Sequence, residues 1–203
     1  MFWNKISPVY DLFENVYNRK VYKGTGIKVA EFIDETDSVL ECACGTGAIT
    51  EEIAKKAQKV LATDFAEGML KRASKKCRKY SNVSFRQEDI TDIKSADNSF
   101  DKVVAGNVIH LLPEPEKALN ELLRVVKPGG KVIIPTYINM LKKSSGIAVS
   151  VIKKMGADFK RQFDIDSYKK FFEEEGFKDI EYYVVDGRMP CAVAVITNKT
   201  VGL

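Results

Sequence analysis

The feature that most constrains this chain is a short strand that runs directly into a glycine turn and then into a helix. The strand covers residues 39–44, the turn is Gly45-Thr46-Gly47, and residues 48–57 repeat apolar side chains on one helix face. In an open α/β sheet, ligands bind outside the carboxyl ends of the strands. Glycine there lets the backbone approach a ligand without a Cβ clash, and the helix's first turn offers free N–H groups. Because such turns also form without a ligand, this motif alone leaves both interpretations open.

The rest of the chain repeats the strand–helix rhythm. Further strands are predicted at 59–63, 83–86, 101–106 and 131–135, and helices at 67–79, 115–126 and 167–175. Pro128-Gly129-Gly130 ends the second of these helices, and Ser167 caps the third. Two final strands, at 179–185 and 191–197, follow each other without a helix, so we expect one to run antiparallel at the sheet edge. The pattern predicts a doubly wound, mainly parallel α/β sheet of about seven strands, preceded by a helical segment at 1–35.

Composition and length fit one globular domain in a reducing compartment. The chain has 203 residues, of which 45% are hydrophobic and 30% charged, so it is neither disordered nor fibrous. No apolar run approaches the ~18 residues of a membrane span, and the N-terminus lacks the apolar stretch of a secretory signal. Four cysteines are too few for a disulfide framework in a chain of this size, so we expect a cytoplasmic location.

Residues 136–161 do not fit the strand–helix rhythm and carry the basic character of the sequence. Six cations against one acid give this segment +5, so the remainder of the +4 chain carries −1. We predict an insertion that caps the substrate site. A basic amphipathic helix resting on a membrane surface is the less favoured alternative. The stretch is too short and too poor in interleaved aromatic residues to favour nucleic-acid binding.

Acidic residues follow the next two predicted strands. Asp64 can accept both hydroxyls of a ribose, although an acid also suits the start of the following helix. Asp89 and Ile90 offer a carboxylate for an exocyclic amine and an aliphatic wall for adenine, although Asp89 alone could be a solvated loop residue. Together they predict a nucleoside cofactor. Glu41, just before the glycine turn, is unfavourable for a diphosphate and favours a cationic group, which argues against a dinucleotide.

As a set, these residues resemble a known family. The motifs that match, in order and at similar spacing, are residues 39–47 (VLECACGTG), Asp64, 88–90 (EDI), 100–103 (FDKV) and 122–130 (LLRVVKPGG). They resemble class I S-adenosylmethionine-dependent methyltransferases over about residues 35–135, most closely the small-molecule branch that includes the ubiquinone/menaquinone biosynthesis methyltransferases. Residues 3–11 (WNKISPVYD) also resemble that branch. Ala43 departs from the family's usual glycine, and Glu41 replaces the commoner aspartate with the charge kept.

The resemblance implies one domain with a Rossmann-like methyltransferase fold over residues 1–203. Its parts are an N-terminal helical lid (1–35), a cofactor-binding core (36–135), the substrate cap (136–161), and a C-terminal helix with strands (162–203). It implies S-adenosylmethionine as cofactor and methyl transfer to a small, apolar or aromatic acceptor. Neither a nucleic-acid partner nor a metal is expected, and the sequence specifies neither the acceptor nor the oligomeric state.

The same resemblance implies a role for individual residues. Glu41, Ala43, Gly45 and Gly47 would line the methionine end of the cofactor; Asp64 would hold the ribose, with Phe65 and Met69 nearby; Asp89 and Ile90 would hold adenine; Asn107 would face the methyl group; and Tyr10 would belong to the lid.

Three other groups have both a functional and a structural interpretation. His110, the single histidine, is a candidate catalytic general base or else a polar wall residue. Cys42 and Cys44 lie on one face of a strand, but in a chain with one histidine they favour apolar packing over a metal site. Aromatic residues near the N-terminus either shape an acceptor pocket or pack in the core: Phe2, Trp3, Tyr10, Phe13, Tyr17 and Tyr22.

Two rival functions stay open at this point. A nicotinamide-dependent reductase would use a similar fold, but Tyr168 lacks the lysine four residues later that such enzymes often use. A non-catalytic S-adenosylmethionine-binding module would bind the cofactor without turnover.

Overall fold

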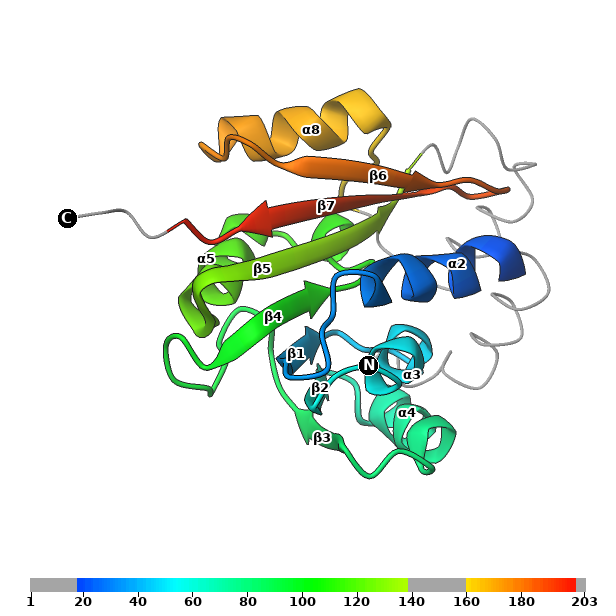
Figure 1. The fold of residues 1–203 in the computed structure, drawn as a ribbon. Helices are drawn as coiled ribbons and strands as arrows, with labels where there is room; N and C mark the ends of the chain where they lie inside the picture. Colours follow the sequence, from blue (N-terminus) through cyan, green and yellow to red (C-terminus); the bar gives the residue numbers. More distant parts are fainter. Residues whose placement is uncertain (1–17, 139–159, 200–203) are drawn as a thin grey trace.

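The structure, a computed structural model, describes residues 18–138 and 160–199. Tyr10, about half of the predicted N-terminal helical segment, and most of the predicted cap at 136–161 therefore lie outside the described residues. Within the two described ranges, helices flank one central sheet (Figure 1). No helix in these ranges is long and apolar enough to cross a bilayer.

One seven-stranded sheet organises the fold, with the order β3-β2-β1-β4-β5-β7-β6. The strands are β1 (Ser38–Cys42), β2 (Lys59–Asp64), β3 (Val83–Gln87), β4 (Phe100–Ala105), β5 (Val126–Tyr137), β6 (Glu181–Val185) and β7 (Cys191–Thr197). The first five strands pair in parallel, whereas β7 is antiparallel to both of its neighbours. The doubly wound, mainly parallel α/β prediction is therefore confirmed, and the strand order reverses between β1 and β4, where such sheets bind ligands.

The antiparallel strand lies inside the sheet, so the expectation that it forms the edge was wrong. β7 pairs with β5 on one side and with β6 on the other, and only its last residue, Thr197, is exposed. β6 forms the edge instead, with Glu181 and Val184 exposed. The physical reason is the apolar run at residues 191–196, which has to be covered on both faces.

The alternation of side chains along the strands divides the core into two halves. The helices are α2 (Arg19–Ala30), α3 (Ala48–Ala54), α4 (Glu67–Cys77), α5 (Pro115–Val125) and α8 (Ile165–Glu174), with a short 3₁₀ helix η1 (Ile109–Leu111). Val39, Val104 and Ile133 belong to the cluster that packs with α2 and α3. Their neighbours Leu40 and Val103 belong to the cluster on the opposite face, which packs with α5 and α8.

The start of α8 differs from its prediction. Asp164 is the N-cap, and its side chain accepts the backbone N–H of Ser167 at 2.9 Å. In return, Oγ of Ser167 accepts the backbone N–H of Asp164 at 2.9 Å. Ser167 is therefore the reciprocal partner in a capping box rather than the cap itself.

The turn Pro128-Gly129-Gly130 lies within β5 rather than before it. The backbone of Asn198 explains the difference, because its carbonyl accepts the N–H of Gly129 at 2.7 Å and its N–H donates to the carbonyl of Gly130 at 2.9 Å. Val126 itself pairs with Phe100 of β4, so the strand begins there. Local turn chemistry reveals neither of these long-range contacts.

All four cysteines are buried free thiols. Burial raises the pKa of the Cys77 thiol to about 11, which keeps it protonated and poorly nucleophilic. In the described part of the chain, no group of three or more His, Cys, Asp or Glu side chains is arranged to hold a metal ion.

Candidate functional site

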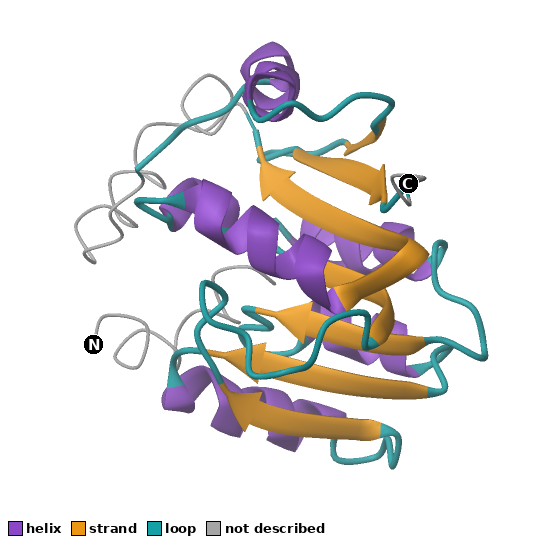
Figure 2. Ribbon diagram, turned by 90° about the vertical axis from the view of Figure 1, so that its left-hand side faces the viewer, coloured by secondary structure: helices purple, strands orange, loops and turns teal. Residues whose placement is uncertain are grey.

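The loop between β1 and α3 forms the centre of the candidate site, at the edge to which the arrowheads of the parallel strands point (Figure 2). Ala43, Gly45 and Gly47 all adopt left-handed backbone conformations, with φ of 53°, 56° and 84°. Such a conformation strains alanine by about 1–2 kcal/mol, so Ala43 is tolerated at a cost. The backbone N–H of Cys44 donates to the carbonyl of Thr63 at 2.9 Å, which holds the loop against β2.

Two glycines near this loop lie in tightly packed places. A Cβ on Gly47 would lie 3.1 Å from Ala73 of α4, and a Cβ on Gly106 would lie 2.7 Å from the Cδ1 atom of Ile49. Gly106 follows β4 directly and lines the site. The sequence prediction did not include it.

Asp64 ends β2 and connects the loop to the next helix. Its Oδ2 accepts the backbone N–H of Gly45 at 2.9 Å, and its Oδ1 accepts the backbone N–H of Ala66 at 2.8 Å. The side chain is buried, and this burial raises the pKa of Asp64 although both hydrogen bonds act to lower it. The carboxylate is therefore held in a fixed position beside the glycine turn.

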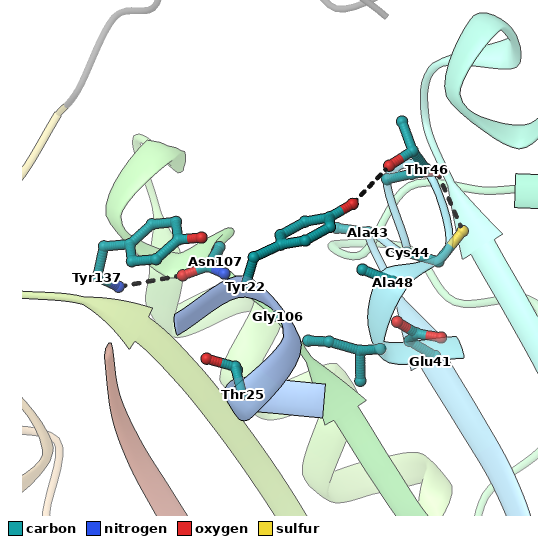
Figure 3. A pocket seen from close by; sticks show the side chains of 12 residues that line it. Tyr22, Thr25, Glu41, Ala43, Cys44, Thr46, Ala48, Gly106, Asn107 and Tyr137 are labelled. Carbon is teal, nitrogen blue, oxygen red and sulfur yellow. Dashed lines mark hydrogen bonds between the residues drawn. The ribbon is translucent and has the colours of Figure 1, made fainter. Parts of the chain in front are cut away.

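Glu41 is the most deeply buried charged residue of the site, at 1% exposure. Its Oε2 has no hydrogen-bond partner among the described residues, and Figure 3 shows the carboxylate beneath the loop that contains Ala43 and Cys44. Burial raises the pKa of Glu41 to about 8, and the charge of Asp64 adds to the shift. Hydrogen bonding to Thr50 offsets part of this shift. A buried carboxylate oxygen without a partner is still costly, so this position is suited to a cationic ligand group.

Two cavities meet around the loop. The larger has a volume of about 270 Å³ and the smaller, above Glu41, about 60 Å³. Four residues line both of them: Ala43, Gly45, Gly106 and Asn107. The two cavities are therefore neighbouring parts of one cleft.

The cleft brings together most of the residues that the sequence singled out. Glu41 lines the smaller cavity; Asp64, Phe65, Met69, Asp89 and Ile90 line the larger; and Ala43, Gly45 and Asn107 line both. Gly47 lines neither cavity, and Tyr10 lies outside the described residues. Sequence reasoning missed Thr25, Thr46, Glu88, Val108, Leu111, Leu112 and Tyr137, which also line the cleft.

The far end of the larger cavity combines a carboxylate with apolar walls. Asp89 is exposed, and its Oδ1 accepts the backbone N–H of Thr91 at 2.8 Å. Ile90 and Met69 are buried, whereas Phe65 is 53% exposed. Such a set can hold a flat ring with an edge amine.

Glu88 lines the same cavity but is already paired within the protein. Arg86 donates to its two carboxylate oxygens at 2.8 and 3.0 Å, and the backbone N–H of Lys94 donates to Oε1 at 2.7 Å. This pairing leaves Asp89, rather than its neighbour, as the carboxylate available to a ligand.

Asn107 sits where the two cavities join and is fixed by β5. It has a left-handed φ of 54°. Its backbone N–H donates to the carbonyl of Pro135 at 2.8 Å, and its Oδ1 accepts the backbone N–H of Tyr137 at 3.1 Å. Figure 3 shows the Asn107 and Tyr137 side chains on the wall opposite Cys44 and Thr46.

Tyr22 of α2 reaches across the smaller cavity. Its hydroxyl lies 3.0 Å from Oγ1 of Thr46 in the glycine turn, a contact that Figure 3 marks, and Nζ of Lys76 donates to the same hydroxyl at 3.4 Å. From the sequence, Tyr22 was one of the N-terminal aromatic residues that either shape an acceptor pocket or pack in the core. The structure gives it a third role, as a side wall of the cleft.

The structure does not bring His110 to the cleft. This residue lies in η1, is 4% exposed, and lines neither cavity. Burial lowers the pKa of His110 to about 4, so its imidazole is neutral at physiological pH. This position favours a structural role for His110 over that of a general base.

The sequence is similar to that of known methyltransferases. Residues 40–134 match the family described as "Methyltransferase domain". The chain is 35% identical to the ubiquinone/menaquinone biosynthesis C-methyltransferase UbiE of Bdellovibrio bacteriovorus, over 98% of this chain and 94% of that protein. It is 34% identical to a demethylmenaquinone methyltransferase of Paenarthrobacter aurescens, over 66% of this chain. That match spans only about half of the relative, 53% of its length.

The fold is similar to that of a solved S-adenosylmethionine-dependent methyltransferase from Thermotoga maritima. The TM-score is 0.73, and the match covers 98% of this chain and 99% of the other. The two sequences are 18% identical, so this likeness establishes the Rossmann-like methyltransferase fold and nothing about the acceptor.

Proposed function

This chain belongs to the S-adenosylmethionine-dependent methyltransferase family that includes the ubiquinone/menaquinone biosynthesis enzymes, and we propose that it methylates a small apolar aromatic acceptor of the hydroquinone class. The names of two relatives support this class of acceptor, since one is a ubiquinone/menaquinone biosynthesis C-methyltransferase and the other a demethylmenaquinone methyltransferase. A ring carbon is the proposed acceptor atom because the relative matched over nearly its whole length is named a C-methyltransferase.

The buried carboxylate of Glu41 is the observation that carries the proposal. One of its oxygens has no partner among the described residues, and it lines the cavity next to the glycine turn. S-adenosylmethionine carries an ammonium group at its methionine end, which is the kind of partner that a buried carboxylate requires. A nicotinamide dinucleotide would instead bring phosphate charge toward this turn, so the reductase alternative is not favoured.

The remaining cleft residues fit the other parts of the same cofactor. Asp64 would accept hydrogen bonds from the ribose hydroxyls, because its two backbone bonds leave lone pairs on both oxygens. Asp89 would accept from the adenine amine, with Ile90 and Met69 against the ring. These roles are predictions from the resemblance, and the shape of the cleft supports them. The role of Tyr10 in the lid rests on the resemblance alone.

When bound, S-adenosylmethionine supplies a methyl group already activated by its sulfonium. The main task of the protein is therefore to position the reactants and exclude water. Transfer to a ring carbon leaves S-adenosylhomocysteine behind and also requires that carbon to lose its proton, so that the ring regains its aromaticity. Gly45 and Gly106 permit close approach of the backbone, and Tyr22 closes one side through Thr46. The proposed lid at 1–35 and cap at 136–161 would complete the acceptor side. We expect this reaction to occur in the cytoplasm, where the buried thiols stay reduced.

Titration calorimetry tests the cofactor assignment. S-adenosylhomocysteine should bind and NADH should not. Glu41→Gln keeps the side-chain shape but removes the charge, and should weaken binding at least ten-fold. Glu31→Gln, on the exposed end of α2, is the matched control and should leave binding unchanged. Binding of NADH alone would favour the reductase instead.

A transfer assay tests the acceptor class. The enzyme is incubated with S-adenosylmethionine carrying a deuterated methyl group and with a short-chain demethylmenaquinone analogue reduced to its hydroquinone. We expect a labelled product with the new methyl on a ring carbon, identified by mass spectrometry and NMR, and no product with a simple primary amine. Cofactor binding without transfer to any acceptor would indicate the non-catalytic module.

A further inference from the structure

One strongly basic surface has no role in the proposed chemistry. Residues 71–79 contain six cations and no acid, so this segment carries a charge of +6. The whole chain carries only +4, which leaves −2 for the remaining residues. The sequence-based view that residues 136–161 alone carry the basic character was therefore wrong. In α4, the buried residues Met69, Leu70, Ala73 and Cys77 recur at helical spacing, and the lysines and arginines lie between them in the sequence. The apolar residues identified the helix, and the charge between them was not counted as a basic segment.

Five of these cations gather around one hollow. The hollow has a volume of about 610 Å³, and every residue that lines it is basic: Arg72, Lys75, Lys76, Arg78 and Lys79. We call this surface the α4 basic face. Lysine and arginine side chains that crowd together repel one another, so such a surface is a natural docking place for an extended anionic partner.

Most of this charge is not neutralised within the protein. Lys79 pairs with Glu51 at 2.9 Å. For Arg72, Lys75 and Arg78, the described residues provide neither an ion pair nor a hydrogen bond to the side chain. Three cations of the face are therefore free to contact an anionic partner.

The α4 basic face is contiguous with the cofactor site. Nζ of Lys76 donates to the Tyr22 hydroxyl at 3.4 Å, and Tyr22 lines the cavity above Glu41. In addition, the Cys77 thiol contacts the carbonyl of Gly47 at 3.8 Å, so the end of α4 rests on the glycine turn. A partner bound to this face would lie beside the cofactor cleft.

We propose that the α4 basic face docks the protein on an anionic phospholipid surface and so holds the active site beside the bilayer. The choice of a membrane rests on the proposed function, because an apolar hydroquinone acceptor partitions into a bilayer. Anionic headgroups attract such polybasic surfaces without needing a shaped pocket. A hollow lined only by basic residues fits that mode of contact.

The aromatic residues beside the face argue against single-stranded nucleic acid as the partner. Lys76 lies 5.6 Å from the ring centre of Tyr22, and Lys79 lies 5.0 Å from that of Tyr80. Both rings are thus already covered by ammonium groups, whereas binding of single strands relies on open aromatic faces for base stacking.

Vesicle sedimentation tests the proposal with the full chain. The vesicles contain phosphatidylcholine with 30 mol% phosphatidylglycerol, and pure phosphatidylcholine serves as the neutral reference. We expect binding to the anionic vesicles alone in 50 mM NaCl, and release in 500 mM NaCl because the attraction is screened. A protein that does not bind the anionic vesicles in 50 mM NaCl overturns the proposal.

The decisive variant combines Arg72→Gln, Lys75→Gln and Arg78→Gln, which leaves Lys76 and the cleft intact. Each basic residue near an anionic surface raises partitioning about five-fold, so this variant should bind about a hundred-fold more weakly. The matched control combines Lys117→Gln, Lys170→Gln and Lys178→Gln, which removes the same charge from α5 and from α8 and the residues after it. Figure 1 shows α8 at the opposite end of the sheet from α4. Equal vesicle binding by the two triple variants overturns the proposal.

Two further measurements separate this inference from the proposed function and from nucleic-acid binding. Both triple variants should keep the wild-type affinity for S-adenosylhomocysteine and the wild-type turnover of a water-soluble acceptor. If the wild type transfers no methyl group, the proposed function fails whatever the vesicles show. Tighter binding of a 30-nucleotide RNA than of anionic vesicles at the same salt concentration would assign the face to nucleic acid and overturn the membrane proposal.

Discussion

Asp64 accepts the backbone N–H of Gly45 at 2.9 Å, across the gap between the end of β2 and the loop after β1. Its second oxygen accepts the N–H of Ala66, at the start of α4. One side chain therefore holds the glycine turn, holds Ala66 just before α4, and lines the cleft. The shape of the turn and the affinity for a ligand consequently depend on the same carboxylate.

Asp64→Asn should lower both the affinity for the cofactor and the stability of the fold. The amide keeps one acceptor oxygen, so either Gly45 or Ala66 loses its partner. Affinity for S-adenosylhomocysteine should fall by about 1–3 kcal/mol, and the free energy of unfolding by about 1–2 kcal/mol, as for lost hydrogen bonds to a charged group. Calorimetry and urea denaturation measure the two effects. Asp92→Asn, at an exposed ion pair with Lys94, is the control, and unchanged affinity in Asp64→Asn would rule out the ribose role.

Gly45→Ala and Gly47→Ala should separate ligand binding from stability. Both positions have a left-handed φ, but a Cβ on Gly45 meets nothing within 4 Å, whereas one on Gly47 meets Ala73 at 3.1 Å. Gly45→Ala should cost about 1–2 kcal/mol of stability from backbone strain, and should weaken cofactor binding because its methyl enters the cleft. Gly47→Ala should cost more stability, by about 1–3 kcal/mol of overpacking. Thermal unfolding with and without S-adenosylhomocysteine measures both, and equal unfolding temperatures for the two apo variants would contradict the packing argument.

The sequence predicted those parts of the fold that local patterns specify. The five parallel strands and the carboxylates at or near their ends follow from apolar runs that end in turns, so the positions of Glu41, Asp64 and Asp89 along the cleft could be anticipated. The internal position of β7 could not, because strand order depends on pairing between distant segments. A clue was present in the unbroken apolar run at 191–196, which suits an interior strand better than an edge.

Side chains that reach the cleft from distant elements were harder to predict. Tyr22 reaches it because α2 packs beside α3, and Asn18 shows why α2 lies there. The side chain of Asn18 donates to the carbonyl of Met189 at 3.1 Å and accepts its N–H at 3.2 Å. This pairing joins residues 171 positions apart, and no periodicity in the sequence records it. For His110 the sequence left two interpretations open for a related reason, since nearness to Asn107 in sequence does not decide whether a side chain reaches the cleft.

His110→Gln should leave catalysis nearly unchanged at pH 7.5, within about three-fold in kcat, because the imidazole does not line the cleft. The substitution should instead change how the free energy of unfolding depends on pH below 6.5. The folded pKa of about 4 lies below the ordinary value of 6.5, so the unfolded chain takes up a proton first as the pH falls from 6.5 to 4. The wild type therefore loses up to about 1.4 kcal/mol per pH unit in this window, a slope that His110→Gln should remove. Urea denaturation at several pH values measures it, and a hundred-fold loss of kcat would restore the general-base role.

Glu41 should make stability depend on pH in the direction opposite to His110, and Glu41→Gln should remove this dependence. Because the folded pKa of about 8 lies above the ordinary value of 4.5, the folded protein keeps a proton that the unfolded chain releases between these values. The wild type should therefore lose stability as the pH rises from 4.5 to 8, by up to about 1.4 kcal/mol per unit. Glu41→Gln carries no titrating group, so its stability relative to wild type should increase through this window and level off above pH 8. Parallel pH profiles for the two proteins would mean that Glu41 is ionised in the folded state.

Cofactor binding should also expel the proton from Glu41. At pH 7 the free protein holds this carboxyl group largely neutral, since its pKa is about 8, whereas an ammonium group in the neighbouring cavity favours the charged form. Binding of S-adenosylhomocysteine at pH 7 should therefore release close to one proton per site. Calorimetry in phosphate and in Tris measures this number, because the two buffers differ in their heat of ionisation. The released proton should disappear in Glu41→Gln and persist in Glu31→Gln. If Glu41→Gln releases as many protons as the wild type, the ammonium group does not bind at Glu41, and the orientation proposed for the cofactor in the cleft is wrong.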